Sequence, residues 1–329
     1  MQRLKVSILY ILKAIGLFKL SEYYSRKFST VLCYHGISTD DENKFLPANY
    51  ISFDAFKEQI ETLLKNGYQF IDLDDLRQKM KSNSLSNKEI VLTIDDGFKS
   101  IFDQMIPYLE EKKIKSTLYV TTKESINKDS IFRLLCNYIF WKSSKHSLEI
   151  NNETIFIKNN KSSWDYILKS EENLSFKERE ILLHEIANKL EVNISNELKK
   201  SFQLINYDDL KNLDLKYVDI QLHTHSHDMT MEQTDLKKDI EKNIELLKDI
   251  GSSPLVHFCY PSGFFKNSDL PMLKSLNIKT ATTCEQGMVS SFTNPLLIPR
   301  LIINSNTPQI VFEAELNGLM ELIRKLKRA

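Results

Sequence analysis

The chain has 329 residues, of which 42% are apolar, so it is long enough for one large domain such as a barrel or for two ordinary domains. Lys and Arg together number 44, as do Asp and Glu, and this zero net charge argues against a general affinity for nucleic acid. The four cysteines lack the C-x-x-C spacing of zinc-thiolate or redox sites. We therefore expect reduced thiols in a cytoplasmic protein without a disulfide framework.

Residues 1–29 have the pattern of an amphipathic N-terminal helix. The apolar stretch at 6–18 is too short to span a bilayer and is interrupted by Lys13. Its apolar residues recur at helical spacing, and basic residues lie among or after them (Lys5, Lys13, Lys19, Arg26 and Lys27). Such a segment packs on its own domain or docks at an anionic membrane surface, here the inner face of the membrane.

Between residues 30 and 122, predicted strands and helices alternate. We expect strands at 30–36, 68–71, 89–95 and 116–121, and helices at 73–81, at 101–113 and between an N-cap at Ser52 and a stop at Gly67. The central strands are apolar on both faces, which is typical of a parallel sheet or barrel covered by helices.

Residues 123–216 interrupt this alternation. We predict helices at 131–140 and 177–190 and a hairpin near 147–158, with no chemical motif, and we expect His146 and His184 to be surface residues. The segment is interpreted as a mostly helical insertion on one face of the barrel.

The alternation resumes with predicted strands at 217–222, 255–260, 280–284 and 297–303, and helices at 234–250, 268–276 and 308–328. Together these elements predict an irregular (β/α) barrel of about seven strand–helix units over residues 30–329. In such barrels the carboxyl ends of the strands carry the functional site.

Chemically reactive side chains follow several of these predicted strands. His35 ends the first, Asp95 and Asp96 end the strand at 89–95, and three alternate histidines between His223 and His227 end the strand at 217–222. The two carboxylates could merely cap the next helix. Alternatively, one binds a cation while the other exchanges a proton, because close carboxylates push their pKa values apart.

The histidine run favours the second alternative. Residues four apart in an extended strand are separated by roughly 13 Å, so the chain must turn across Thr224–Ser226 before His223 and His227 can share one metal. A carboxylate from a neighbouring strand would complete a site of two histidines and one carboxylate, which leaves positions open for water and substrate.

Three motifs in this order resemble those of the polysaccharide deacetylase family, the NodB-homology group or carbohydrate esterase family 4. They are Thr-Ile-Asp-Asp-Gly at 93–97, His-Thr-His-Ser-His at 223–227 and Phe-Cys-Tyr-Pro-Ser-Gly at 258–263. The resemblance covers roughly residues 30–122 and 217–304. It implies a distorted (β/α) barrel and a hydrolase that removes N-linked acetyl groups from an amino sugar in a polysaccharide, oligosaccharide or lipid-linked glycan.

The resemblance also implies roles for individual residues. Asp96, His223 and His227 would bind a divalent metal, with zinc expected first and Fe, Co, Ni or Mn as alternatives, and Asp95 would be the general base. The turn after the strand at 255–260 would hold the oxyanion and substrate, through Tyr260, Pro261, Ser262 and Gly263.

The chain departs from the family pattern in two places. Cys259 and Ser262 stand where an arginine and a tyrosine are common, and Arg300 could supply the missing positive charge. The usual late histidine is also missing, and His35, in a Tyr-His-Gly context similar to a variant of the family, is the predicted general acid. His225 is the alternative, or an auxiliary residue that orients a ligand.

Other functions remain open from the sequence alone. The same site could serve a deformylase or another amide or ester hydrolase, a non-catalytic glycan-binding protein, or an iron-dependent oxygenase. The motifs do not specify the sugar, the metal, the oligomeric state or the role of the insertion. Because the sequence shows no export signal, we expect an N-acetylated glycan intermediate in the cytoplasm, rather than finished cell wall, to be the partner.

Overall fold

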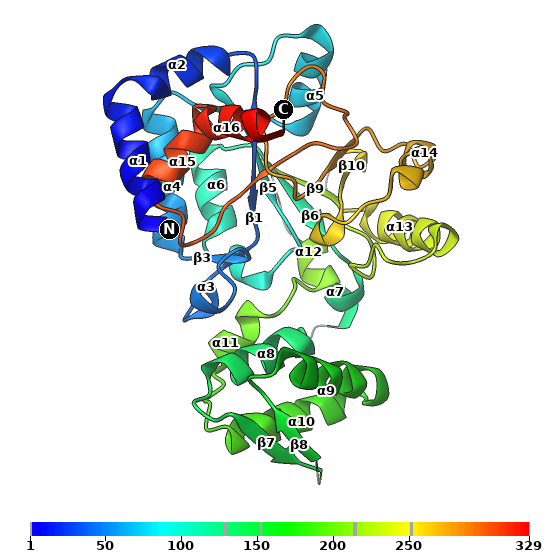
Figure 1. Ribbon diagram of the computed structural model, residues 1–329. Helices are drawn as coiled ribbons and strands as arrows, with labels where there is room; N and C mark the ends of the chain where they lie inside the picture. Colours follow the sequence, from blue (N-terminus) through cyan, green and yellow to red (C-terminus); the bar gives the residue numbers. More distant parts are fainter. Residues whose placement is uncertain (1, 128–129, 152, 213–215, 251–252, 329) are drawn as a thin grey trace.

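The computed structural model describes residues 2–127, 130–151, 153–212, 216–250 and 253–328 (Figure 1). Its centre is a parallel sheet in the order β11-β10-β9-β6-β5-β1-β12, with β4 also paired to β5. The strands are β1 Thr30–Tyr34, β4 Gln69–Phe70, β5 Glu89–Ile94, β6 Ser116–Val120, β9 Val218–Leu222, β10 His257–Cys259, β11 Thr280–Thr282 and β12 Leu301–Ile302.

The segment around β12 closes this sheet into a barrel. The amide of Ile298 donates to the carbonyl of Ala281 over 2.9 Å, and Leu301 and Ile302 pair with β1. One short stretch of chain therefore joins both edges of the sheet. The predicted irregular (β/α) barrel is confirmed, and its sheet has eight strands. Within the predicted strand at 297–303, only β12 is a regular strand.

Helices α4 Phe53–Lys65, α5 Leu73–Ser82, α6 Met105–Lys112, α13 Gln233–Leu247 and α14 Leu270–Ser275 surround the strands. Helix α4 begins where Ser52 accepts a hydrogen bond from the amide of Ala55, and its apolar face buries Phe56 and Ile60 completely. The predicted helix at 101–113 is shorter than expected, because residues 99–101 form the 3₁₀ turn η1 Lys99–Ile101.

Each predicted terminal helix is in fact two helices broken at a glycine. Helices α1 Gln2–Ala14 and α2 Leu17–Tyr24 meet at Gly16, and α15 Gln309–Leu316 and α16 Leu319–Arg328 meet at Gly318. Both glycines have a positive φ, 82° and 83°, which a side chain disfavours. The four helices pack together on one flank of the barrel (Figure 1). Within the described ranges, no helix is long and apolar enough to cross a membrane.

Most of the inserted segment lies outside the sheet, at the lower end of Figure 1, whereas its first and last helices lie next to the barrel. It contains α7 Lys123–Asn127, α8 Phe132–Lys142, α9 Asn160–Asn173, α10 Phe176–Lys189, α11 Asn196–Ser201, α12 Tyr207–Lys211 and the antiparallel hairpin β7 Ser147–Ile150 and β8 Glu153–Phe156. Leu135, Ile139, Ile167 and Phe202 form a core here, which Tyr50 and Phe98 of the barrel side join. The predicted insertion also includes residues 128–129, 152 and 213–215, which lie outside the described residues.

A small second sheet pairs β2 Gly36–Ile37 with β3 Tyr50–Ile51, on either side of α3 Glu42–Phe45. It follows β1 directly and carries the chain from the strand end toward the insertion. The loop after β1 therefore forms part of the wall between the barrel and the inserted segment.

Candidate active site

Three predicted metal ligands converge at the carboxyl end of the barrel. Asp96 follows β5, and its Oδ1 lies 3.1 Å from Nε2 of His223 and 3.2 Å from Nε2 of His227. The chain after β9 turns as predicted, because Thr224 and His227 both have left-handed backbones with φ of 63° and 57°. This turn brings two histidines four residues apart onto one carboxylate.

The ring of His223 is oriented by its second nitrogen. Nδ1 lies 2.9 Å from the carbonyl oxygen of Cys259, on the neighbouring strand β10. Because a carbonyl can only accept, Nδ1 carries a proton, and Nε2 is the nitrogen that faces Asp96 and could bind a metal once it has lost its own proton. One oxygen and two imidazole nitrogens lie within 4.8 Å of one another, a donor set that fits a divalent cation such as zinc.

Asp95 occupies a different environment from Asp96. Its side chain points into the barrel, is 2% exposed, and receives two hydrogen bonds of 2.7 Å from Nη1 and Nη2 of Arg300. Arg300 is fully buried and also donates to the carbonyl of Thr283. Burial alone would raise the pKa of Asp95, but the charge and hydrogen bonds of Arg300 outweigh it and hold that pKa well below its usual range.

Thiols complete the surroundings of this ion pair. Sγ of Cys259 lies 3.3 Å and Sγ of Cys33 lies 3.6 Å from Oδ2 of Asp95. Burial raises the pKa of both thiols, so they remain protonated donors. Nη2 of Arg300 lies 3.2 Å from Sγ of Cys259, so the guanidinium sits beside the residue that stands where an arginine was expected.

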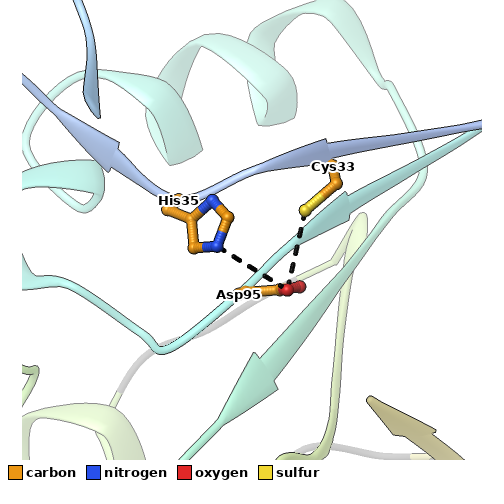
Figure 2. Close-up of side chains that lie close together, drawn as sticks. All are labelled: Cys33, His35 and Asp95. Carbon is orange, nitrogen blue, oxygen red and sulfur yellow. Dashed lines mark hydrogen bonds and ion pairs between the residues drawn. The ribbon is translucent and has the colours of Figure 1, made fainter. Parts of the chain in front are cut away.

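His35 faces the same carboxylate from the end of β1, as Figure 2 shows together with Cys33. Its Nε2 is 3.8 Å from Oδ2 of Asp95. Its Nδ1 is buried and has no hydrogen-bond partner among the residues described. Burial lowers the pKa of His35, partly offset by the nearby charge of Asp95, so the ring is neutral near pH 7.

The four residues predicted to bind the oxyanion and substrate follow β10, and their surroundings differ. Tyr260 is fully buried and donates its hydroxyl to the carbonyl of Leu296, so its side chain does not face the site, and Pro261 is also buried. Gly263 packs so closely on Cys284 that a Cβ would lie 2.4 Å from the Cβ of that residue, and its amide donates to Tyr260. The exposed Ser262 is therefore the remaining candidate for an oxyanion donor.

The other histidines lie away from the ligand triad. Nδ1 of His225 is 2.9 Å from Oγ1 of Thr122, and the amide of His225 donates to Asp239, so this residue fixes the turn between His223 and His227. His257 is buried at the start of β10, at the other end of that strand. His146 and His184 are exposed, as predicted.

A cavity of about 260 Å³ opens beside Asp96 and His227, between the barrel and the inserted segment. The wall that the inserted segment contributes to this cavity is mostly apolar. It includes Ile131 and Leu134, together with the guanidinium of Arg133. Nε of Arg133 lies 3.9 Å from a carboxylate oxygen of Glu171. Arg133 could not be identified from the sequence, because it lies in an ordinary helical pattern and only the fold brings it to the cavity.

Comparisons with known proteins agree with this arrangement. Residues 82–281 match the profile of the polysaccharide deacetylase family, whereas no curated protein matches the sequence. Because this match spans more than half of the chain, the protein belongs to the polysaccharide deacetylase family, and it is a hydrolase that acts on amide bonds.

Solved structures of low sequence identity share the fold. The deacetylase PplD of Streptococcus pyogenes, in complex with acetate, is 16% identical with a TM-score of 0.57, over 89% of this chain and 97% of that chain. IcaB of Ammonifex degensii is 15% identical with a TM-score of 0.54, over 88% and 97%. A de-N-acetylase of Aggregatibacter actinomycetemcomitans is 13% identical with a TM-score of 0.54, over 88% and 99%.

Proposed function

We propose that the protein is a metal-dependent N-deacetylase that releases acetate from an N-acetylated amino sugar in a glycan. The observation that carries this proposal is the convergence of Asp96, His223 and His227, with the carboxylate of Asp95 beside them. A carboxylate oxygen of Asp95 lies within 4.8 Å of a ring nitrogen of His223. The structural neighbours named as deacetylases or de-N-acetylases support the same reaction class.

Asp96, His223 and His227 would hold the metal, which we propose to be zinc on the basis of its two nitrogen donors and one oxygen donor. A bound divalent metal would polarise the amide carbonyl and lower the pKa of the attacking water. The hydrogen bond from His223 to the carbonyl of Cys259 keeps the ligand ring in one orientation before any metal arrives.

Asp95 would accept the proton that the attacking water loses. Its low pKa keeps it ionised at any working pH, and its pairing with Arg300 fixes its position beside the ligands. The same pairing makes Asp95 a weak base, so a proton on it is readily passed on. Oδ2 of Asp95 is 3.8 Å from Nε2 of His35, which is the group best placed to receive that proton.

His35 then returns the proton to the leaving amine. The water oxygen forms a bond to the carbonyl carbon, the bond from that carbon to nitrogen breaks, and the nitrogen leaves as an amine once it has gained the proton. His35 suits this role because it is neutral at rest and lies at the edge of the site. The amide of Ser262 is the proposed donor to the oxyanion.

The test is acetate release from N-acetylglucosamine oligomers before and after treatment with a chelator, followed by addition of zinc. The proposal predicts that activity disappears on chelation and returns with zinc. Activity that survives complete removal of metal would contradict it. Release of formate from N-formyl sugars, without acetate from N-acetyl sugars, would replace it with a deformylase on the same ligands.

A further inference from the structure

The terminal helices present an apolar surface that the barrel does not cover. Leu9 of α1 and Phe18 of α2 are buried against Ile310 and Leu319 of the C-terminal helices. The N-terminal segment is therefore docked on the domain, one of the two arrangements that its sequence allowed. This packing uses only one side of α1.

The opposite side of α1 is apolar as well. Leu4, Ile8, Ile11 and Ile15 are 67%, 45%, 61% and 70% exposed. Their spacing of four, three and four residues places them on one face of the helix, which we name the apolar stripe. In α2, Leu20 and Tyr23 are also exposed, at 62% and 65%. Several large apolar side chains exposed on neighbouring helices are unusual on a soluble domain. Such exposure is typical of a surface that binds another protein or a membrane.

Charge identifies the kind of partner. Among residues 4–28 and 309–327, eight are Lys or Arg and four are Glu, whereas the whole chain balances 44 basic against 44 acidic residues. Lys5 of α1, Lys19 of α2 and Lys27, which follows α2, are exposed on this flank. Exposed apolar side chains combined with a local excess of positive charge are complementary to an anionic lipid surface.

The surface is held in place by the fold. Ser21 of α2 donates to Oδ1 of Asn317 over 3.0 Å, and Ser25 donates to the carbonyl of Asn317 over 3.0 Å. The ammonium of Lys325 lies 4.6 Å from the ring centroid of Phe28, which ties α16 to the end of α2. Helices α1, α2 and α16 therefore present one fixed surface, which needs no ordering before it binds.

We propose that this flank is a docking surface for an anionic bilayer, in which the apolar stripe enters the headgroup region and the lysines contact acidic lipid headgroups. The protein would lie on the membrane rather than cross it. This proposal is independent of the reaction at the active site, because the surface shares no residue with the ligand triad or the cavity beside it.

The test is flotation of the full chain with vesicles of phosphatidylcholine, with and without about one third phosphatidylglycerol. We expect binding to the anionic vesicles only. The triple variant Ile8→Ser/Ile11→Ser/Ile15→Ser should lower the bound fraction roughly tenfold or more, and Lys5→Glu/Lys19→Glu/Lys27→Glu should lower it to a similar degree.

A matched control replaces equally exposed apolar residues elsewhere, Phe156→Ser/Ile181→Ser/Phe292→Ser, and should bind vesicles like the wild type. Acetate release from a soluble substrate should be the same for all four proteins, which shows that each variant is folded. No binding to anionic vesicles would overturn the proposal. Self-association that the apolar triple variant abolishes, without vesicle binding, would overturn it in favour of a contact between copies of the chain.

Discussion

The two neighbouring carboxylates at the end of β5 lie in opposite settings. Asp96 faces the mouth of the barrel, where two histidines and the wall of the inserted segment surround it. Asp95 faces the interior, where Arg300 holds both of its oxygens. The comparison shows that adjacent residues can serve different purposes: Asp96 is open to a cation, whereas Arg300 holds Asp95 in position and keeps it ionised until the proposed proton transfer. The predictions below separate these two regions, from the largest expected effect to the smallest.

Variants of the ion pair between Asp95 and Arg300 should show that its effect on stability differs from its effect on activity. Arg300→Met leaves the charge of Asp95 buried without a partner, so we expect a loss of about 3–5 kcal/mol in the free energy of unfolding. The double variant Asp95→Asn/Arg300→Met should regain most of that stability, since both charges are gone, while acetate release stays at least about a thousandfold below wild type. Urea unfolding and turnover, measured on the same samples, check this; a double variant with near-normal turnover would show that Asp95 only fills space.

His35 should affect the rate without affecting the metal. His35→Ala removes the group that we propose to return the proton to the amine, so we expect turnover to fall by about a hundredfold to ten-thousandfold. The metal content should stay at the wild-type value, because His35 is not in the ligand triad. Elemental analysis and steady-state kinetics give both quantities, with His184→Ala as the control on an exposed histidine. Loss of the metal, or an unchanged rate, would contradict the assigned role.

A buried histidine at the end of the barrel opposite the candidate active site should make stability depend on pH without taking part in the reaction. His257 lies at the start of β10, and burial lowers its pKa from 6.5 to about 4. The unfolded chain therefore binds a proton that the folded chain resists, and stability is lost as the pH falls from above 6.5 toward 4. At pH 5 this amounts to about 2 kcal/mol relative to pH 7.5.

The variant His257→Asn should reduce that pH dependence by the same amount. Urea unfolding of both proteins at the two pH values measures it, and subtraction of the variant from the wild type removes the contribution of the ligand histidines. An identical slope for wild type and His257→Asn would show that His257 titrates normally.

The smallest expected effect on the reaction comes from a substitution in the wall of the cavity. Arg133→Ala removes a cation that faces the cavity and is only loosely paired with Glu171, so we expect KM to rise by about three- to tenfold with kcat nearly unchanged. Lys169→Ala, on the exposed surface of the same inserted segment, is the matched control. A drop in kcat without a change in KM would place Arg133 in the reaction rather than in substrate binding.

The sequence predicted the barrel and the residues at its strand ends because these depend on local patterns. A run of apolar residues that ends in Asp95 and Asp96, or in His223, identifies the strand and its end together. The breaks at Gly16 and Gly318 were missed because helical spacing continues across both, and only the backbone angle stops the helix. Tyr260 was expected at the substrate, but its hydroxyl is used in the core, which its sequence motif could not show. The contact of Arg300 with Asp95 joins residues 205 positions apart, so it depended on the closure of the barrel.

The central claim is that a metal held by Asp96, His223 and His227 works with Asp95 to remove acetyl groups. The most direct test is elemental analysis together with acetate release from N-acetylglucosamine oligomers, for wild type and for Asp95→Asn. The account predicts about one metal ion per chain in both proteins, acetate from the wild type, and none above background from the variant. A wild-type protein that binds no metal, or a variant that releases acetate at the wild-type rate, would contradict it.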